Sequence, residues 1–336
     1  MHSAITAVIL AAGKGTRMKS SRAKVLHEVF FKPMLHHVLD SAQQAGIGQT
    51  VVIVGHQRDS VLTSIEQYPH TPVIQEEQLG TGHAVLCTES ACAESDQVMI
   101  LCGDTPLIRP ETLQDLVKTH TETNSTVTLM TTLLEDPFGY GRIISDQGGN
   151  ILEIVEQKDA DSAQRAIKEI NAGIYLVKRE FLFTALKQVG TDNSQEEVYL
   201  TDIISIANRQ KHKVHKFIHP LAIDVLGVNS RIELAQAHGE LQMRHNRELM
   251  LSGVTMYSPE TILIAPNCTI GQDSVIQAGV QISGRSTIGS GVHLETGAVL
   301  DNCTLGDNVM IGAHSVLHNS TIEETEHIPP LTYRVG

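Results

Sequence analysis

A short segment near the N-terminus combines residue types that bind phosphate groups. An apolar run over residues 6–10 leads into small residues and then a cation: Leu10, Ala11, Ala12, Gly13, Lys14, Gly15, Thr16, Arg17. Small residues let the backbone approach a ligand and point N–H groups at phosphates. The glycines alone fit a plain turn equally well. The guanidinium of Arg17 and the ammonium of Lys24 favour a phosphate site.

Two other glycine motifs fit this segment poorly. A P-loop requires Gly-Lys followed by Ser or Thr, whereas Lys14 is followed by Gly15. A dinucleotide-binding fingerprint requires a third glycine where Met18 stands. It also requires an acidic residue at the end of the second strand, where this chain has Gly55-His56. Neither motif is predicted.

A second candidate follows the apolar run 97–101, where Cys102 and Gly103 lead to Asp104. Ligands of open α/β sheets bind beyond the carboxyl ends of the strands. A carboxylate at that edge can hold Mg²⁺, which takes one or two protein ligands together with phosphate oxygens and water. By spacing alone, an Asx-turn or a helix cap before Pro106 is the favoured alternative.

Further polar residues lie at other predicted strand ends and turns. Gln75, Gly80 and Thr81 offer amide and backbone groups for reading a base edge, and a helix N-cap at Thr81 is the alternative. Taken one at a time, Gly141, Glu156, Asn171 and Asn229 fit ordinary turns. The sequence has no Gly-x-Ser-x-Gly motif, so no serine nucleophile is indicated.

The elements that would position these residues alternate between strand and helix up to about residue 230. Strands are expected at 6–10, 50–54, 71–74 and 97–101, with helical patterns between them, such as 33–45. This alternation indicates a mostly parallel sheet. From Thr126 the pattern predicts an antiparallel extension (142–145, 151–155, 170–177), two helices (181–188, 198–210) and two strands (214–219, 222–225). One long helix is expected over 231–251.

The last third of the chain has a period of six residues. The aliphatic residues at this period, with one five-residue step, are Ile264, Ile270, Ile276, Ile282, Ile288, Leu294, Leu300, Leu305, Ile311 and Leu317. A six-residue period predicts a hexapeptide β-helix, here of about three coils of roughly eighteen residues. Such a short stack leaves an open end, so we expect it to self-associate.

Length and composition limit the class of protein. A chain of 336 residues suits two domains, and its apolar fraction of 41% supports packed cores. The net charge of −13 argues against a nucleic-acid partner. Five scattered cysteines indicate neither a disulfide framework nor a zinc site. With no stretch long enough for a membrane span, we expect a cytoplasmic protein without a membrane partner.

Several of these segments together resemble one family. Leu10–Met18 and Lys24–His27 look like the start of the bacterial N-acetylglucosamine-1-phosphate uridylyltransferases, one half of a bifunctional enzyme of UDP-N-acetylglucosamine synthesis. Further matches follow in the same order, at 78–84, 103–107, 139–143, 154–160 and 227–229. The resemblance covers about residues 5–330.

The resemblance implies a fold and three regions. The fold is α/β, with a mixed, mostly parallel Rossmann-like nucleotidyltransferase sheet, a helical arm and a short left-handed hexapeptide β-helix. The nucleotidyltransferase domain would cover residues 1–229, the arm 230–252 and the β-helix 253–336. A triangular stack can pack about a threefold axis, so we expect a homotrimer.

The resemblance also implies roles for single residues. Asp104 and Asn229 would hold Mg²⁺, and Arg17 and Lys24 would stabilise charge on the phosphates. Uridine would be surrounded by Leu10, Ala11, Ala12, Gly13, Gln75, Gly80 and Thr81, and Gly103 would also bind substrate. Gly141, Glu156 and Asn171 would bind the sugar. UTP and N-acetylglucosamine 1-phosphate would be the substrates. The sugar phosphate is already an anionic nucleophile, so no general base is required.

Three departures from the family pattern are visible. Cys102 stands where the family usually has an aromatic residue, at a position expected to contribute backbone only. Ala172 replaces a usual threonine, which would relax the choice of sugar. The chain ends at Gly336, where the family's β-helix continues, so acetyltransferase activity is expected to be absent. The alternatives are a nucleotidyltransferase for another sugar 1-phosphate and a non-catalytic protein that binds nucleotide sugars.

Overall fold

The computed structural model describes residues 4–336 as two compact units. The first unit contains the described residues up to Glu28 and Lys32–Leu234, and the second contains Val29–Phe31 and Ala235–Gly336. Within 4–336, no helix has the length and apolar character needed to cross a bilayer. All five cysteines are free, as expected from their spacing.

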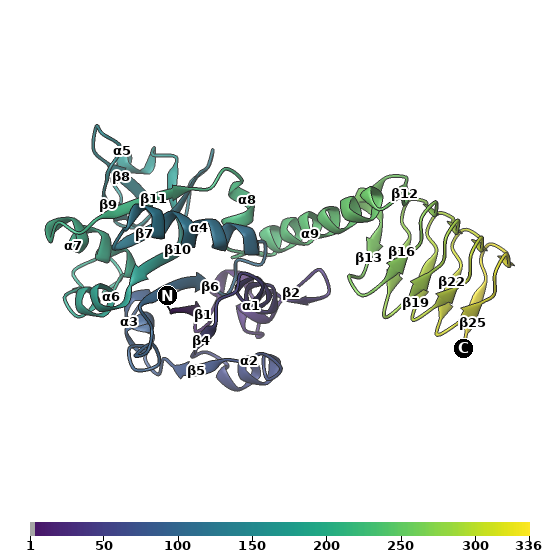
Figure 1. The fold of residues 1–336 in the computed structure, drawn as a ribbon, viewed down its shortest axis with the longest axis horizontal. Coiled ribbons are helices and arrows are strands. Elements are labelled where there is room, and N and C mark those ends of the chain that lie inside the picture. The colour runs from purple at the N-terminus through teal and green to yellow at the C-terminus, as the bar shows by residue number, and fades with distance from the viewer. Residues whose placement is uncertain (1–3) are drawn as a thin grey trace. The chain divides into compact units, whose positions relative to one another are not determined.

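The first unit is built on one nine-stranded sheet (Figure 1). Its main path runs in the order β11-β7-β10-β6-β1-β4-β5. The bounds are β1 Ile5–Leu10, β4 Gln49–Val54, β5 Thr71–Ile74, β6 Gln97–Cys102, β7 Val127–Leu133, β10 Glu169–Lys178 and β11 Val214–Ile218. β6, β1, β4 and β5 are mutually parallel, which confirms the expected core. β10 runs antiparallel to both β6 and β7, which confirms the predicted extension.

Two smaller strands and a set of helices complete this unit. β8 (Arg142–Ser145) pairs with β10 and with β9 (Ile151–Val155). The helices are α1 Met34–Gln44, α2 Arg58–Ser64, α3 Thr81–Leu86, α4 Pro110–Thr123, α5 Ser162–Arg165, α6 Arg179–Leu186, α7 Ile203–Arg209 and α8 Ala222–Val225. Short 3₁₀ turns cover Thr16–Met18, Lys24–Leu26 and Leu200–Asp202, and a small hairpin joins β2 (Glu28–Val29) to β3 (Lys32–Pro33).

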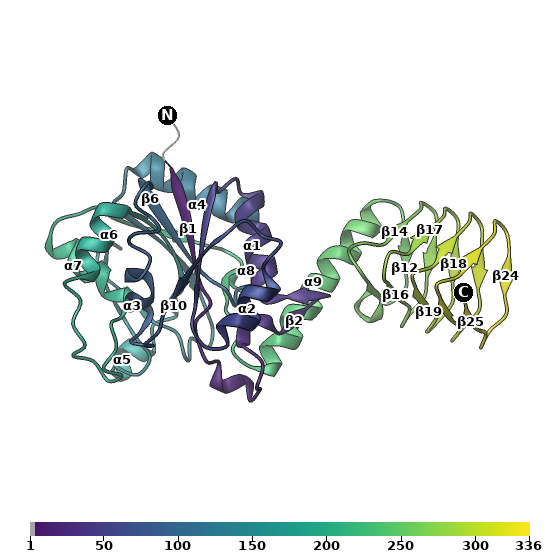
Figure 2. The ribbon, with the colours of Figure 1, turned by 90° about the horizontal axis from the view of Figure 1, so that it is seen from below.

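Side chains of alternate residues in the central strands pack into two cores on opposite faces of the sheet. Val8 and Ile100 pack with residues of α3, α6 and α7, whereas Ile9 and Leu101 pack with residues of α1 and α4. Figure 2 shows helices on both sides of the strands. A strand buried on both faces reads as a continuous apolar run, and this is why these strands could be predicted.

One predicted strand is wrong. Residues 222–225 form the helical turn α8. The run Ala-Ile-Asp-Val is too short for its pattern to separate strand from helix. Tertiary contacts decide the conformation: the buried Asp224 carboxylate lies 2.9 Å from Arg109 Nε and 3.3 Å from His219 Nε2. The Asp224 N–H also donates to the carbonyl of Leu221.

The second unit begins within helix α9 (Arg231–Leu251), which has the predicted bounds. The hairpin tip at Phe30 belongs to this unit, because its ring contacts His238 and His245 of α9. This contact could not be predicted from the sequence.

A β-helix of three parallel sheets follows α9 in the second unit. The sheets hold five, five and four strands, so the chain completes four coils and adds two strands of a fifth. The strands are β12 Thr255–Met256, β13 Leu263–Ile264, β14 Thr269–Ile270, β15 Val275–Ile276, β16 Gln281–Ser283, β17 Thr287–Ile288, β18 His293–Leu294, β19 Val299–Asp301, β20 Thr304–Leu305, β21 Met310–Ile311, β22 Val316–His318, β23 Thr321–Ile322, β24 His327–Ile328 and β25 Tyr333–Val335.

The expectation of about three coils is therefore too low. The repeat starts before Ile264, at β12, and runs on past Leu317 through Ile322 and Ile328, which are both buried. A second five-residue step, from Leu317 to Ile322, hides this continuation from a search for a strict period of six. Each such step shortens the coil, so Val275 pairs with His293 but Thr287 pairs with Thr304.

Candidate active site

A cavity of about 310 Å³ lies at the carboxyl ends of the parallel strands in the first unit. The residues that line it are Leu10, Ala11, Ala12, Gly13, Lys24, Val25, Gln75, Gln78, Gly80, Thr81, Ala84, Cys102, Asp104 and Glu197. Nine of the residues singled out in the sequence are in this wall: Leu10, Ala11, Ala12, Gly13, Lys24, Gln75, Gly80, Thr81 and Asp104. Arg17, Gly103, Gly141, Glu156, Asn171 and Asn229 are outside it.

Two cations converge on one amide oxygen beside this cavity. Arg17 Nη2 donates to Asn229 Oδ1 at 2.8 Å, and Lys24 Nζ donates to the same oxygen at 3.0 Å. Lys24 Nζ also forms an ion pair with the Asp104 carboxylate. Lys24 and Asp104 are mostly buried, so this pair is shielded from solvent. Four residues from three separate segments of the chain therefore share one centre.

Asp104 and Asn229 are held together by backbone contacts as well. The Val228 N–H donates to the Asp104 carbonyl at 2.8 Å. A Cβ at Gly227 would stand 3.4 Å from the Asp104 carboxylate oxygens. That distance is an ordinary van der Waals contact, so the backbone of Gly227 packs directly beside the carboxylate. No helix cap forms at Asp104, because α4 begins six residues later at Pro110.

The start of α9 fixes Asn229. The Glu233 carboxylate accepts from the backbone N–H groups of Asn229 and Ser230, at 2.6 and 2.7 Å. Ser230 Oγ in turn accepts from the Glu233 N–H at 3.3 Å. This reciprocal arrangement is a capping box, which Ser-x-x-Glu at 230–233 signals in the sequence. Glu233 was missed, although this signal could have identified it.

The other end of the cavity is shaped by backbone contacts between loops. Gln78 Nε2 donates to the Ala12 carbonyl at 2.7 Å, and Gln75 Nε2 donates to that of Gly80 at 3.1 Å. The helix N-cap considered for Thr81 is wrong, because α3 is capped at Gly80. Thr81 Oγ1 instead accepts from the Leu200 N–H at 3.2 Å. Gln78 was not among the residues singled out.

Gly103, expected to bind substrate, lies next to the end of β1, outside the cavity wall. Its N–H donates to the Leu10 carbonyl at 3.0 Å. A Cβ there would meet the same oxygen at 3.0 Å, so a side chain would push the two strand ends apart.

Gly141, Glu156 and Asn171 form a second cluster. The Asn171 N–H donates to the Gly141 carbonyl at 2.9 Å, and a Cβ at Gly141 would stand 3.4 Å from Glu156 Oε1. Thr201 Oγ1, which the sequence reading missed, donates to Glu156 Oε1 at 3.3 Å. Burial raises the pKa of Glu156, and the charge of Asp159 adds to this, whereas Thr201 and Arg142 oppose it.

Cys102 and Asn171 each bond to Gly173, which links the two clusters. Cys102 Sγ donates to the Gly173 carbonyl at 3.5 Å, and Asn171 Oδ1 accepts from the Gly173 N–H at 3.0 Å. Its side chain thus bonds within the protein, and the expectation that Cys102 contributes only backbone to the site stays a prediction. Burial raises the pKa of its thiol to about 12, so it is neutral at physiological pH. Ala172 packs in the core with Ile174 and Leu176, away from the cavity wall.

Two tyrosines near the site were also missed. Burial raises the pKa of Tyr140, with Glu233 and Asp104 adding to the effect and Arg17 opposing it. The Tyr175 hydroxyl is fully buried and has no hydrogen-bond partner among residues 4–336. Burial and the charge of Glu156 raise the pKa of Tyr175. Tyr175 lies in β10, where an aromatic residue is expected to be part of the core. Tyr140 lies just before β8, within the matched segment 139–143, and that match could have identified it.

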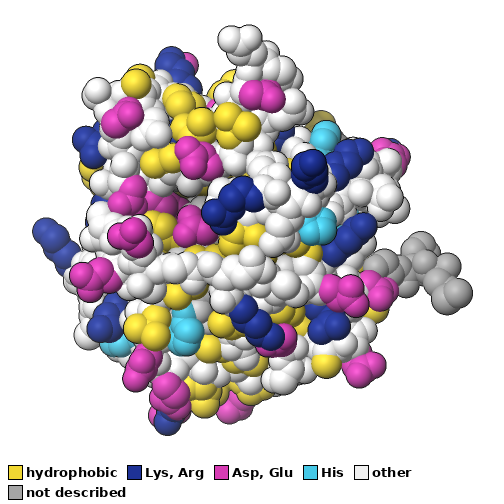
Figure 3. Space-filling model, turned by 90° about the vertical axis from the view of Figure 1, so that its left-hand side faces the viewer, with side chains coloured by type: hydrophobic (Ala, Val, Ile, Leu, Met, Phe, Trp, Pro, Cys, Tyr) yellow, Lys and Arg dark blue, Asp and Glu magenta, His cyan; other side chains and the backbone are white. Residues whose placement is uncertain are grey.

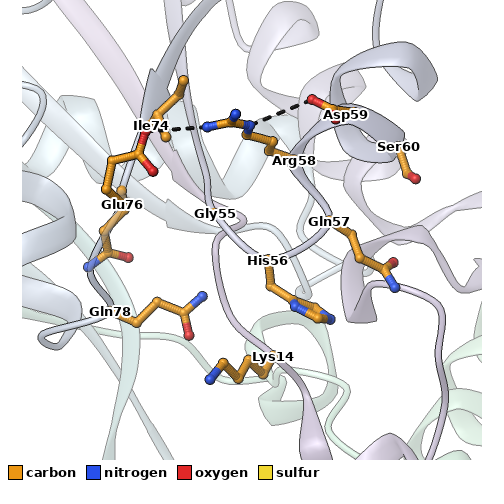
Figure 4. Close-up of a pocket in the computed structure, with 11 residues that line it drawn as sticks. Lys14, Gly55, His56, Gln57, Arg58, Asp59, Ser60, Ile74, Glu76 and Gln78 are labelled. Carbon is orange, nitrogen blue, oxygen red and sulfur yellow. Dashed lines mark hydrogen bonds and ion pairs between the residues drawn. The ribbon is translucent and has the colours of Figure 1, made fainter.

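A second, wider cleft of about 750 Å³ shares Gln75 and Gln78 with the first cavity. Figure 4 shows its polar wall, where Arg58 lies between Asp59 and Glu76. Lys14 and His56 point into the same space. On the face drawn in Figure 3, cations and carboxylates are interspersed.

Comparison with known families identifies both parts of the chain. Residues 7–247 match the MobA-like NTP transferase domain, and residues 285–319 match the bacterial transferase hexapeptide repeats. A relative named bifunctional protein GlmU, from Desulfotalea psychrophila, is 54% identical over 96% of this chain and 95% of its own length.

Longer relatives carry the same name. The GlmU of Syntrophotalea carbinolica is 44% identical over 96% of this chain and 69% of its own length. That of Geobacter metallireducens is 46% identical over 90% of this chain and 64% of its own length. The chain therefore belongs to the GlmU family of nucleotidyltransferases, as a UDP-N-acetylglucosamine pyrophosphorylase with C-terminal hexapeptide repeats.

Proposed function

We propose that the protein transfers the uridylyl group of UTP to N-acetylglucosamine 1-phosphate by a Mg²⁺-assisted in-line attack. The observation that supports this reaction best is the convergence of Arg17 and Lys24 on Asn229, with Asp104 paired to Lys24. Transfer of a phosphoryl-type group depends mainly on positioning and on neutralisation of charge. This centre has the two cations and the oxygen ligands that such a reaction needs.

The donor set fits Mg²⁺. Asp104 and Asn229 offer a carboxylate and an amide oxygen, and the same ammonium, Lys24 Nζ, bonds to both. Two oxygens that share one cation can share another, and Mg²⁺ prefers oxygen ligands. Residues 4–336 hold no group of three or more His, Cys, Asp or Glu side chains placed for a metal, which agrees with a site completed by substrate oxygens. When bound, Mg²⁺ would neutralise negative charge on the triphosphate.

The bond changes involve no acid–base group of the protein. A phosphate oxygen of the sugar 1-phosphate attacks the α-phosphorus of UTP, the bond from that phosphorus to its bridging oxygen breaks, and pyrophosphate leaves with the electron pair. The guanidinium of Arg17 and the ammonium of Lys24 would offset the charge that builds on the phosphate oxygens. The nucleophile is already an anion, so it needs no base.

The substrates would occupy the two clusters. The cavity around Ala11, Ala12 and Thr81 would hold the uridine nucleotide, because its wall presents backbone groups and the amides of Gln75 and Gln78. Gly141, Glu156 and Asn171 would hold the sugar, where a carboxylate can accept hydroxyl hydrogen bonds. The two substrates would then meet beside Lys24 and Asp104.

A substrate grid tests this proposal. Pyrophosphate release would be measured for four nucleoside triphosphates against several sugar 1-phosphates, with Mg²⁺ and with EDTA. We expect turnover only with UTP, N-acetylglucosamine 1-phosphate and Mg²⁺. Faster turnover with another sugar phosphate would reassign the substrate. No turnover with UDP-sugar binding intact would indicate a non-catalytic protein.

We also propose that these 336 residues assemble as a homotrimer through the β-helix. The three parallel sheets of the β-helix give it three flat faces, so copies of one face can pack about a threefold axis. Light scattering across a dilution series should give three times the monomer mass. A stable monomer at assay concentration would overturn this assembly.

We propose, finally, that these residues do not transfer acetyl groups. About a third of the Syntrophotalea and Geobacter relatives is not matched by this chain. The Desulfotalea relative is also called bifunctional, although this chain spans 95% of it. A direct assay with glucosamine 1-phosphate and acetyl-CoA is therefore required, and thiol release above the no-enzyme rate would overturn this proposal.

A further inference from the structure

The segment between Arg17 and Lys24 has few local contacts that would hold it in place. Residues 19–22 join the 3₁₀ turn that carries Arg17 to the one that carries Lys24, and all four are exposed. No side chain caps the turn at Lys24–Leu26, whose N-cap is Ala23. Local contacts of this kind leave the position of Lys24 poorly fixed.

A side chain from another loop anchors this segment. Gln57 Oε1 accepts a hydrogen bond from the Ala23 N–H at 2.7 Å, and Gln57 Nε2 donates to the Ser21 carbonyl. Both ends of one amide thus hold the two backbone groups that come just before Lys24. Gln57 lies in the turn after β4 and lines the wide cleft (Figure 4).

The backbone at Gln57 indicates that the side chain matters. Its φ of +53° is in the left-handed region, where glycine is favoured and an L-residue with a Cβ is strained. Strain of this kind persists where surrounding contacts determine it, and it is concentrated at functional positions. Ala23 is buried, so its N–H would have no partner if the amide were removed.

We propose that Gln57 is a positioning residue, whose amide fixes Ser21 and Ala23 and thereby holds Lys24 at Asp104 and Asn229. This inference rests on the proposed uridylyl transfer. Gln57 lies outside the cavity wall and acts on the reaction only through Lys24. A displacement of Lys24 by an ångström would weaken charge neutralisation in the transition state more than it would weaken substrate binding.

The test is a double-mutant cycle with Gln57→Gly and Lys24→Ala. Gly suits the left-handed backbone, so Q57G removes the amide without adding strain. We expect Q57G to lower kcat about tenfold while the KM for the sugar phosphate changes less than twofold. In the Lys24→Ala background, Q57G should have no further effect on kcat. Equal tenfold losses in both backgrounds, or an unchanged kcat in Q57G, would overturn the proposal.

Three controls separate the two hydrogen bonds of the Gln57 amide, called the clamp below, from other effects of the substitution. Gln57→Asn keeps an amide but is one methylene too short to reach both partners, so it should match Q57G. Arg58→Ala changes the neighbouring wall residue, which pairs with Asp59 and Glu76, and should leave kcat unchanged. Trypsin should cleave between Lys19 and Lys24 faster in Q57G than in R58A, and equal cleavage would contradict the clamp. If the unmodified protein shows no turnover, the proposed function fails, whereas the cleavage comparison still tests the clamp.

Discussion

The two units differ in how far apart in the sequence their contacting residues lie. In the β-helix, neighbouring coils pair in register, so that Ile282 lies on Leu300 and Leu300 on Leu317. In the first unit, Arg17 and Lys24 come from the loop after β1, Asp104 follows β6, and Asn229 precedes α9, and the four meet at one point. The repeat is stabilised locally, from one coil to the next, whereas the site exists only when the whole sheet is folded. Substitutions should therefore mainly change stability in one unit and catalysis in the other.

Asp104→Ala should give the largest effect and break the proposed site. Loss of its carboxylate removes a proposed metal ligand and the partner of Lys24. We expect uridylyl transfer to fall about a thousandfold, measured as pyrophosphate release. Asp59→Ala, an exposed carboxylate on the neighbouring cleft, is the matched control and should leave the rate unchanged. Equal activity of the two variants would contradict the proposal that Asp104 is a metal ligand.

Leu300→Ala in the β-helix should lower stability and leave catalysis nearly unchanged. Leu300 is fully buried between Ile282 and Leu317, so truncation leaves a cavity that the narrow core cannot close. We expect a loss of about 3 kcal/mol in the unfolding transition of the β-helix. The kcat and KM values at 25 °C should stay within twofold. His293→Ala, on the exposed side of β18, is the control for stability. A large loss of kcat in folded L300A would break the contrast between the units.

Glu156→Gln should separate sugar binding from nucleotide binding within the first unit. Gln retains the shape but loses the charge that would accept sugar hydroxyls. We expect the KM for N-acetylglucosamine 1-phosphate to rise roughly thirtyfold, with the KM for UTP unchanged. Stability at pH 8 should not fall, because burial raises the pKa of Glu156 and so disfavours its charged form. Glu153→Gln on the exposed face of β9 is the control, and a matching rise there would remove Glu156 from the sugar site.

Protonation of His120 at lower pH should give the smallest effect. It should change only the stability of the first unit. Burial lowers its pKa to about 4 from the ordinary 6.5, with Lys178 adding to the shift. The unfolded chain therefore binds the extra proton more readily, and this stability is complete above pH 6.5 and lost as pH falls towards 4. At pH 5.5 the loss should be about 1.4 kcal/mol relative to pH 7.5.

The matched variant for this effect is His120→Gln. Gln can retain the hydrogen bond to Thr128 Oγ1, which His120 Nδ1 makes at 2.8 Å, but it does not titrate. Urea unfolding at both pH values would measure the difference between the two proteins. The same pH dependence in both would show that His120 is not its source.

The sequence by itself determined the class and the order of the elements. Parallel strands buried on both faces and a six-residue repeat are local patterns, so both the sheet and the β-helix could be predicted. The separate motifs also marked Gly13, Gly80 and Asp104, each at a strand end or turn where a ligand can be approached. What each motif did alone was ambiguous, since turns and caps use the same residue types.

Tertiary structure decided what lies between the motifs. Only the folded sheet brings Lys24 to Asp104 and Asn229, and only the loop after β4 brings Gln57 to Ala23. It also turned 222–225 into a helix through the contacts of Asp224, and placed Phe30 against α9. These contacts join residues far apart in the chain, and their energies depend on burial and on partners that no local window of sequence contains.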